Sequence, residues 1–416
     1  MNVTVIGLGY IGLPTAALIA SEGIKVVGVD VNQHIVSTIN KGKIHIIEPD
    51  LDILVQSSVQ SGNLRATTEP EKADIFIIAV PTPFKGNHEP DLSYIKSAAK
   101  SIAMVLEKGN LVILESTSPV GTTEKLTKWI SEERSDLSFP EYSINNEVDV
   151  AISHCPERVL PGNIINELVK NDRIIGGMTT QCAEKSREFY NIFIKANCFI
   201  TDSRTAELSK LVENSFRDVN IAFANELSLI CDKLNLNVWE LIKFANHHPR
   251  VNILQPGPGV GGHCIAVDPW FIVDSAPEQA KMIKLARLIN DEMPNVVINK
   301  INQKVSKISK AISELSIACL GLSFKPDIDD LRESPAIEIA KHVSSMGFKK
   351  NYVVEPNIKN LPVELNPQCT ELVELENALT SSDIILLLVD HSSFKEINLS
   401  LLSGKQIIDT RGALTG

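Results

Sequence analysis

The sequence lacks paired cysteines. Its 416 residues contain seven cysteines, an odd number, and these are scattered without any C-x-x-C pair. This pattern excludes a disulfide framework and a zinc knuckle. It indicates reduced thiols in a cytoplasmic protein.

Positive charge is also scarce. The chain carries 40 Lys and Arg against 51 Asp and Glu, which gives a net charge of −11. This balance argues against nucleic acid or an anionic membrane as a partner. A local cluster of Lys and Arg can still bind a small anionic substrate, so that class of ligand stays open.

A long membrane-spanning run is missing as well. The uncharged stretch 3–20 resembles a signal peptide in hydropathy, but Gly7, Gly9, Gly12 and Pro14 interrupt it and no basic segment precedes it. No later stretch is long enough to span a bilayer. We therefore expect a soluble protein, whose length predicts two or three domains.

The N-terminus carries the pattern of a dinucleotide-binding unit. A β-branched strand over 2–6 leads into Gly7-x-Gly9-x-x-Gly12, a helix over 13–22 and a second strand over 25–29 that ends at Asp30. In this context the glycines let a pyrophosphate approach the helix N-terminus, and the acid binds the ribose hydroxyls. No arginine follows Asp30 to hold a 2′-phosphate, which favours NAD over NADP.

Further strand–loop–helix units follow the first. Apolar runs over 74–80, 111–114 and 150–153 predict strands buried on both faces of a parallel sheet. Ligands of doubly wound sheets bind outside the carboxyl ends of the strands, which makes Thr82, Thr117 and Glu157 candidates for the site. Turn formation or helix capping is the alternative for the threonines, and a surface ion pair is the alternative for the glutamate.

The strand pattern stops near residue 205. Long helices are predicted over 205–234 and 277–308, and the first presents Lys210, Asn214 and Arg217 on one face. A solvated face with a Glu213–Arg217 pair is the simpler interpretation of that face. The adjacent histidines within 246–250 diverge on a helix and have no third ligand nearby, so no metal site is expected.

A glycine- and proline-rich loop over 256–262 delivers one thiol, Cys264, and one carboxylate, Asp268, to the chain. A helical turn that begins near Cys264 places both groups on one face. A thiolate beside backbone N–H donors and a carboxylate is a layout for covalent chemistry on a carbonyl. The alternative is a buried structural cysteine in a glycine turn.

The third region repeats the strand–helix alternation without the glycine fingerprint. Strands are predicted near 317–320, 351–354 and 383–389, with a helix over 335–346, so this second doubly wound domain is expected to bind a different nucleotide. Lys325, Arg332 and Arg411 follow predicted strands and are candidates for a diphosphate. Asp329 and Asp330 are placed to orient Arg332. An ion-pair network at a domain joint is the alternative.

Together these motifs resemble the nucleotide-sugar 6-dehydrogenase family, which oxidises UDP-glucose and UDP-N-acetylhexosamines, over essentially the whole chain. UDP-glucose enzymes typically have a lysine where this chain has Val267. His263 and the Val-Asp-Pro sequence are similar to the UDP-N-acetylhexosamine branch. The longer segments 80–86 and 246–270 resemble members that act on UDP-N-acetyl-D-mannosamine. The matching segments are IGLGYIGLP (6–14), VPTP (80–83), ESTSPVG (115–121), PER (156–158), KLVEN (210–214), GGHCIAVD (261–268) and FK (324–325) with Arg332.

The resemblance implies an α/β fold with an NAD-binding Rossmann domain over 1–203, a central all-α dimerisation domain with long helices over 204–310, and a Rossmann-like UDP-binding domain over 311–416. It implies a four-electron oxidation of C6 through a thiohemiacetal and a thioester on Cys264. The product is a uronic acid for bacterial surface polysaccharide, such as the enterobacterial common antigen. The partners implied are a UDP-sugar and a second copy of the chain, bound through the central helices.

The resemblance also implies a role for each matching position. Lys210 and Asn214 stabilise an oxyanion, Asp268 moves a proton, and Glu157 with Thr117 handles the hydrolytic water. Arg250 reaches the substrate of a neighbouring subunit. NAD is implied at Gly7, Gly9, Tyr10, Ile11, Gly12, Asp30, Pro81, Thr82, Thr117 and Arg332, and the substrate at Glu157, Arg158, Lys210, Asn214, Arg250, Gly261, His263, Phe324, Lys325 and Arg411.

Other functions stay open from the sequence. Within the family, UDP-N-acetylglucosamine or UDP-glucose is the alternative substrate. An ordinary two-electron dehydrogenase leaves Cys264 structural, and an NAD-binding regulatory protein has no use for Lys210, Cys264 and Asp268 together.

Overall fold

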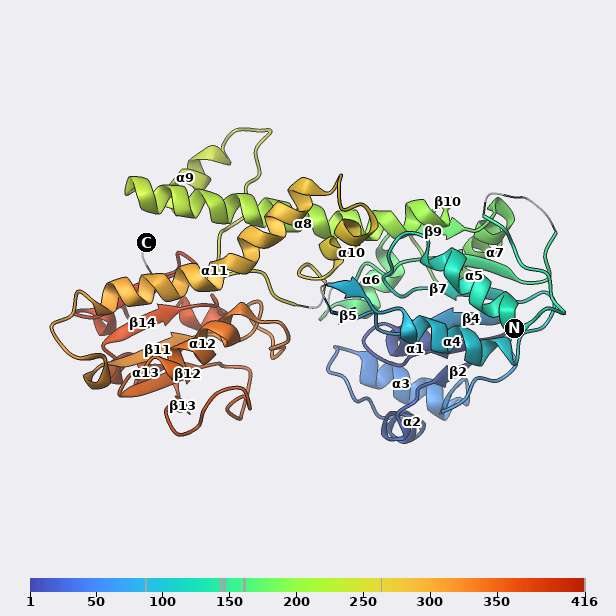
Figure 1. The fold of residues 1–416 in the computed structure, drawn as a ribbon. Helices are drawn as coiled ribbons and strands as arrows, with labels where there is room; N and C mark the ends of the chain where they lie inside the picture. The colour runs from blue at the N-terminus through green and yellow to red at the C-terminus, as the bar shows by residue number, and fades with distance from the viewer. Residues whose placement is uncertain (87, 143, 145–146, 160–161, 263, 415–416) are drawn as a thin grey trace. The chain divides into compact units, whose positions relative to one another are not determined.

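The computed structural model describes residues 1–416 apart from 87, 143, 145–146, 160–161, 263 and 415–416 (Figure 1). The chain forms two compact units. One contains Met1–Glu213 and Asp274–Ala276, and the other contains Asn214–Val273 and Pro277–Gly416. Helix α8 (Ser203–Leu234) contributes its first turns to one unit and the remainder to the other.

An eight-stranded sheet forms the centre of the first unit. Its order is β10-β9-β8-β7-β4-β1-β2-β3, and its neighbours run parallel except for the antiparallel pair β8 and β9. The order reverses between β1 and β4, which is where a doubly wound sheet opens a crevice for a ligand. The strands are β1 (Asn2–Ile6), β2 (Lys25–Val29), β3 (Leu64–Thr67), β4 (Ile75–Ile78), β7 (Leu111–Leu114), β8 (Ala151–His154), β9 (Arg173–Gly177) and β10 (Cys198–Asp202).

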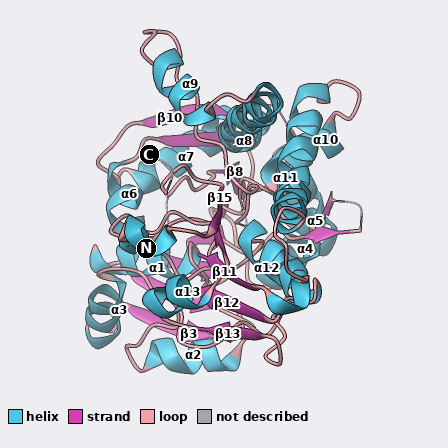
Figure 2. Cartoon of the chain, turned by 90° about the vertical axis from the view of Figure 1, so that its left-hand side faces the viewer, coloured by secondary structure: helices cyan, strands magenta, loops and turns pink. Residues whose placement is uncertain are grey.

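Helices cover this sheet and bury its apolar strands. All four residues of β4 and all four of β7 are buried, as expected for central strands of a parallel sheet. Figure 2 shows the helices in cyan and the strands in magenta. The helices of the first unit are α1 (Gly12–Ser21), α2 (Gln33–Asn40), α3 (Leu51–Gln60), α4 (Ser93–Ala103), α5 (Thr122–Glu133), α6 (Ile164–Lys170) and α7 (Thr180–Tyr190), and a hairpin of β5 (Phe84–Lys85) and β6 (Glu89–Pro90) follows β4.

A five-stranded parallel sheet forms the core of the second unit, in the order β13-β12-β11-β14-β15. Helices α11 (Lys281–Val305) and α12 (Pro335–Ser345) pack on one face of β11, and α13 (Leu375–Ser381) packs on the other. The order reverses between β11 and β14, so this sheet has its own ligand crevice. The strands are β11 (Ser316–Leu320), β12 (Lys350–Val354), β13 (Thr370–Leu372), β14 (Ile384–Leu387) and β15 (Gln406–Asp409).

The predicted fold class is confirmed, and most predicted elements lie within a few residues of their expected bounds. Helix α11 begins four residues later than expected, at Lys281, after a loop that contains Pro277. The short helices α9 (Val238–Ala245) and α10 (Asp268–Ser275) flank the glycine loop. None of the helices among the described residues has both the length and the apolar character to cross a bilayer. The expected domain limits at 203/204 and 310/311 stay a prediction.

Candidate active site

The loop between β1 and α1 has the geometry of a pyrophosphate-binding turn. Gly7 has a φ of +93°, and its N–H donates to the Val29 carbonyl at 2.8 Å. A Cβ on Gly12 would lie 1.8 Å from the Gly7 carbonyl oxygen, so only glycine is tolerated there. A Cβ on Gly9 would meet nothing within 4 Å, which leaves open space beside the N-terminus of α1. Tyr10 and Ile11 lie half-buried in the same turn.

Asp30 faces this glycine turn from the end of β2. Its carboxylate accepts hydrogen bonds from the N–H of Leu8 at 3.1 Å and of Asn32 at 2.9 Å. An acid held against the glycine loop is placed to accept the ribose hydroxyls of a dinucleotide. The residues present therefore fit the adenosine half of NAD.

The loops after β4 and β7 meet at two of the predicted threonines. The Thr82 hydroxyl donates to the Thr117 carbonyl at 2.5 Å. Thr82 follows β4 and Thr117 follows β7. The strand order reverses next to β4, and the carboxyl ends of the strands at such a point are where a doubly wound sheet binds its ligand. Pro81, the residue before Thr82, is exposed.

Glu157 lies in a buried ion pair that sequence reasoning missed. Its carboxylate binds the guanidinium of Arg173, at the start of β9, and also accepts the N–H of Arg158 at 2.7 Å. The exposed fractions are 6% for Glu157 and 3% for Arg173. The alternative considered for Glu157 was an ion pair at the surface. Glu157 does form an ion pair, but the pair lies in the interior, so that alternative was wrong about its location.

A second acid, Glu115, lies behind this pair. It accepts the Tyr190 hydroxyl at 2.7 Å, and the Arg173 guanidinium lies 5.4 Å over the Tyr190 ring. Burial raises the pKa of Glu115 to about 7, against the opposing effect of the Arg173 charge. Glu115 belongs to the motif 115–121 but was given no role from sequence, and Arg173 lies outside every motif, since only the sheet brings the two together.

Helix α8 is tied to the loop that carries Thr117. The Glu207 carboxylate accepts N–H groups from Gly121 at 2.6 Å and from Thr123 at 2.7 Å, at the start of α5. Lys210 follows one turn later and is half-buried. Glu207 thereby connects α8, which carries Lys210, to the loop that carries Thr117.

Arg158 and Glu213 form the ion pair on this part of α8. Their side chains meet at 2.5 Å, and Arg158 also donates to the Asp172 carbonyl. The Glu213–Arg217 pair considered in sequence is therefore replaced by a contact from a distant loop. Arg217 is exposed.

In the second unit, Asn214 and Asp268 are hydrogen-bonded. The Asn214 side-chain amide donates to the Asp268 carboxylate at 2.5 Å, and Asp268 is only 3% exposed. The Asp268 N–H in turn donates to the Cys264 carbonyl at 2.8 Å, which closes the expected helical turn just before α10. Cys264 is half-buried. The backbone of Cys264, the Asp268 carboxylate and the Asn214 amide therefore belong to one hydrogen-bonded structure.

Glycines allow the loop before Cys264 to pack tightly. A Cβ on Gly261 would lie 2.4 Å from the Glu333 carbonyl oxygen and 2.9 Å from Phe324, and a Cβ on Gly257 would lie 2.5 Å from the Arg411 guanidinium. Phe324 and Arg411 come from the loops after β11 and β15. Two predicted substrate residues thus lie against the glycine loop.

Buried polar side chains from α8 and α11 anchor the same loop. Asn225 accepts the Gly257 N–H at 2.9 Å and donates to Asn290 at 2.9 Å. Asn290 donates to Asp218 at 2.8 Å, and Asp218 also binds the Arg287 guanidinium at 2.5 Å. Burial raises the pKa of Asp218, and the Arg287 charge opposes that shift. None of these four positions belongs to a motif that the sequence analysis singled out.

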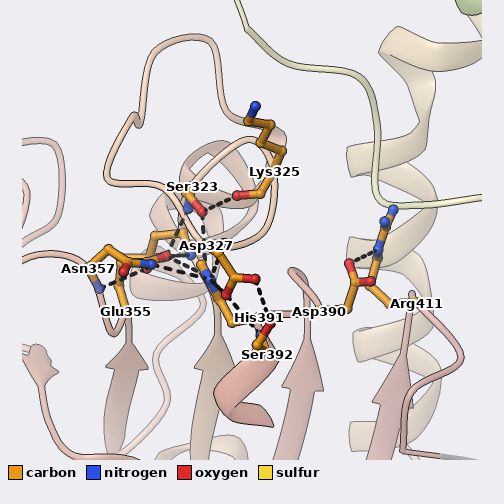
Figure 3. Close-up of polar contacts among 10 residues, drawn as sticks. Ser323, Lys325, Asp327, Glu355, Asn357, Asp390, His391, Ser392 and Arg411 are labelled. Atoms are coloured by element: carbon orange, nitrogen blue, oxygen red, sulfur yellow. Dashed lines mark hydrogen bonds and ion pairs between the residues drawn. The ribbon is translucent and has the colours of Figure 1, made fainter. Parts of the chain in front are cut away.

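The remaining basic candidates lie on loops of the second sheet. Arg411 donates from Nε to Asp390 at 2.7 Å, and Lys325 is half-buried and points away from its neighbours (Figure 3). Arg332 pairs with Asp330 at 2.6 Å, which confirms the expected partner, while Asp329 is exposed.

The other expected substrate residues outside the second sheet are Arg250 and His263. Arg250 is exposed after α9, in a loop that Asn246 closes by hydrogen bonds to both backbone groups of Ile253. The expectation for His263 falls outside the described residues. Among the described residues, no group of three or more His, Cys, Asp or Glu side chains is arranged to hold a metal ion.

Family models match the chain in three consecutive segments. The NAD-binding domain of the UDP-glucose/GDP-mannose dehydrogenase family matches residues 1–194, the central domain matches 204–292, and the UDP-binding domain matches 318–416. The matches follow the order expected from the motifs.

Individual relatives match over nearly the full chain. A UDP-N-acetyl-D-mannosamine dehydrogenase of Campylobacter jejuni is 64% identical and spans 95% of this chain and 97% of its own. An NDP-N-acetyl-D-galactosaminuronic acid dehydrogenase of Ralstonia nicotianae is 58% identical and spans 99% of this chain and 96% of its own. A solved UDP-D-ManNAc dehydrogenase structure from Pyrococcus horikoshii superposes with a TM-score of 0.89 at 39% identity, over 99% and 96% of the two chains.

Proposed function

Since this chain belongs to the UDP-glucose/GDP-mannose dehydrogenase family, we propose that it oxidises C6 of UDP-N-acetyl-D-mannosamine to the carboxylate of UDP-N-acetyl-D-mannosaminuronate. The observation that carries this proposal is the connection of Cys264 to Asp268 and of Asp268 to Asn214. The link from Cys264 to Asp268 runs through the backbone and places the cysteine one helical turn before the carboxylate. A two-electron oxidation of an alcohol needs no cysteine at that position. A four-electron oxidation does, because an aldehyde becomes a good second hydride donor only after a nucleophile adds to it.

The chemistry divides into four steps. The primary alcohol loses a proton and a hydride to give an aldehyde, and the Cys264 thiolate adds to the aldehyde carbon to give a thiohemiacetal. Loss of a second hydride gives a thioester, which water cleaves to release the carboxylate and restore the thiol. NAD, when bound at the β1–α1 turn, is the hydride acceptor.

Asn214 and Lys210 act on the oxygen of these intermediates. An amide nitrogen carries two N–H groups, and the bond to Asp268 uses one of them, so the other is available to an oxyanion. Lys210 lies four residues earlier on α8 and supplies a cation on the same helix face. Asp268 is held by the Asn214 amide and by the bond from its own N–H to the Cys264 carbonyl. Its carboxylate accepts the proton of the alcohol.

Glu157 and Thr117 orient the water that cleaves the thioester. The Glu157 carboxylate is held by Arg173 and by the Arg158 N–H, and each carboxylate oxygen keeps lone pairs for further donors. A carboxylate that two partners hold in place is suited to orient a water molecule. Thr117 is fixed through its carbonyl by Thr82, which leaves its hydroxyl to the reaction.

The chain also functions as a homodimer through α8. Six large apolar side chains along this helix are 40–70% exposed, and at 3.6 residues per turn they fall within about 80° of one another. Such a strip along a 32-residue helix suits a second copy of itself, because a two-fold interface pairs the same surface on both chains. The strip consists of Leu208, Val212, Phe216, Phe223, Ile230 and Leu234.

The proposed chemistry also favours a location and a role. Cys264 has to stay reduced for the thiol route, so a reducing compartment, the cytoplasm, is the proposed location. The product, an acidic amino sugar activated by UDP, is suited to transfer into a surface polysaccharide.

The test is the number of NADH molecules formed per molecule of UDP-N-acetyl-D-mannosamine, for the wild type and for Cys264→Ala. Two NADH per sugar, lost in the variant, is the expected result. UDP-N-acetyl-D-glucosamine, UDP-N-acetyl-D-galactosamine and UDP-glucose are measured alongside, because a relative named for a galactosaminuronic acid is 58% identical. Two NADH with another sugar alone overturns the substrate, and one NADH that survives the substitution overturns the mechanism.

A further inference from the structure

A buried histidine and a buried glutamate lie at the carboxyl ends of the central strands of the second sheet. Glu355 follows β12 and His391 follows β14, and both side chains have no exposed surface. Both lie near the place where the strand order reverses between β11 and β14, the usual ligand crevice of such a sheet. Figure 3 shows that they converge on the loop that follows β11.

Glu355 holds the first part of that loop. One carboxylate oxygen accepts the N–H groups of Leu322 at 2.7 Å and of Ser323 at 3.0 Å, and the same oxygen contacts His391 Nε2 at 3.0 Å. Burial favours a raised pKa for Glu355, but the bonds from His391 and Leu322 outweigh it and lower the pKa. The acceptor is therefore an ionised carboxylate, the stronger kind.

His391 holds the far end of the loop, and its contacts define its tautomer. The Asp327 N–H donates to Nδ1 at 2.9 Å, so Nδ1 is an acceptor and the ring proton lies on Nε2, directed at Glu355. Asp327 has a φ of +60°, which is uncommon for a residue with a side chain. Its carboxylate also accepts the Ser392 N–H at 2.9 Å and hydroxyl at 2.6 Å, which holds it in that conformation.

The segment between these two anchors carries Phe324 and Lys325. In its middle, the Ser323 hydroxyl donates to the Lys325 carbonyl at 2.8 Å. The Lys325 ammonium points away from the buried pair (Figure 3). Phe324 lies against Gly261 and Gly262, which precede Cys264 by three and two residues. An added Cβ would come within 2.9 Å of Phe324 at Gly261 and within 3.0 Å at Gly262.

We propose that His391 and Glu355 are positioning residues for the reaction, acting through the loop 322–327. They fix its two ends so that Lys325 meets the anionic substrate and Phe324 supports the glycine loop of Cys264. Neither side chain touches the reacting atoms. This inference rests on the proposed function for its substrate, but the fixed loop itself rests only on the contacts above.

A purely structural role predicts a different result. A buried polar pair that only stabilises the fold changes the unfolding temperature when it is removed, and it leaves the folded enzyme's constants as they were. A positioning role changes KM for the UDP-sugar and the affinity for UDP in the folded enzyme, while affinity for NAD stays the same.

The experiment compares His391→Phe, His391→Asn and Glu355→Gln in the full chain. His391→Phe removes both ring nitrogens, whereas His391→Asn keeps an acceptor near Nδ1 for the Asp327 N–H. We expect His391→Phe and Glu355→Gln to raise KM for the UDP-sugar and Kd for UDP about tenfold, the effect of one lost buried hydrogen bond. His391→Asn should recover at least half of that change on a logarithmic scale.

His342→Asn and Glu364→Gln, both exposed in the same unit, are the matched controls.

Amide hydrogen exchange of residues 322–327 is the second measurement. Exchange at Asp327 should rise at least tenfold in His391→Phe, and it should stay close to wild type in the two controls. Unchanged exchange together with unchanged UDP affinity in folded His391→Phe overturns the proposal. If His391→Phe does not fold, Ser323→Ala decides by the same two measurements, because it removes a hydroxyl that donates to the Lys325 carbonyl at 2.8 Å and lies 3.4 Å from His391 Nε2. If the wild type does not bind UDP, the proposed function is overturned. The anchoring of the loop 322–327 by His391 is still tested in that case, because amide exchange is measured without substrate.

Discussion

The carboxylate of Glu157 is bound to the guanidinium of Arg173 inside the first unit, with both side chains almost fully buried. The Coulomb attraction has to offset the cost of removing two charges from water. Glu157 belongs to the Pro-Glu-Arg motif of the predicted site, whereas Arg173 begins a neighbouring strand. The pair therefore couples the position of a site residue to the packing of the sheet.

Removal of Arg173 should be severely destabilising. Arg173→Ala leaves a buried carboxylate without its partner, which costs about 3–5 kcal/mol in the free energy of unfolding. Chemical denaturation measures the change. Arg187→Ala is the control, because Arg187 pairs with Glu184 at the surface, where loss of an ion pair costs about 0–1 kcal/mol. Equal effects of the two substitutions would show that the Glu157 charge is compensated by other groups.

Glu115 should make stability depend on pH. Burial raises its pKa from 4.5 to about 7, so between these values the folded chain holds a proton that the unfolded chain has released. Stability should therefore fall as pH rises from about 4.5 to about 7, by an amount on the order of 3 kcal/mol for this group. Burial raises the pKa of Glu207 to about 7 as well, so both acids contribute to the slope.

Glu115→Gln tests this assignment by urea denaturation at a series of pH values. The neutral side chain should remove roughly half of the slope and make the protein more stable than wild type above pH 7. Glu188→Gln, an exposed position on the same helix as Tyr190, should keep the wild-type slope. A slope that Glu115→Gln leaves intact would refute the role of Glu115.

Local patterns were enough to predict the framework of the chain. Apolar runs such as 111–114 indicate strands because a central parallel strand is buried on both faces. The glycine fingerprint before α1 and the glycine loop before Cys264 reflect close approaches of the backbone, and the structure shows those approaches at Gly12 and Gly261. Such constraints act over a few residues, so they are visible in sequence.

The partners of the site residues were not predictable in the same way. Arg173 lies 16 residues from Glu157, and His391 lies 36 residues from Glu355. Only the pairing of strands brings such residues together, and a single polar residue at a strand end has many possible partners. The roles assigned to Lys210, Glu157 and Lys325 therefore stay predictions, which substitutions can test.

Asn214→Asp should impair the second oxidation. The change places two carboxyl groups in the contact that now measures 2.5 Å, so one of them has to take up a proton. The oxyanion also loses its amide donor, which costs about 10²–10³ in kcat. Steady-state kinetics over a pH range measures the change, with Asn295→Asp, an exposed position on α11, as the control. A kcat within about threefold of wild type would remove Asn214 from the reaction.

The apolar strip of α8 should determine the oligomeric state. Phe216 and Phe223 are 70% and 51% exposed, and a charge placed on either is buried without a partner if the strip meets its copy. Phe216→Glu and Phe223→Glu should therefore convert a dimer to a monomer, as sedimentation equilibrium measures. Val363→Glu is the matched control, because Val363 is 96% exposed and lies outside the strip. A wild type that is monomeric at micromolar concentration, or variants that sediment as dimers, would show that the strip does not serve a second copy.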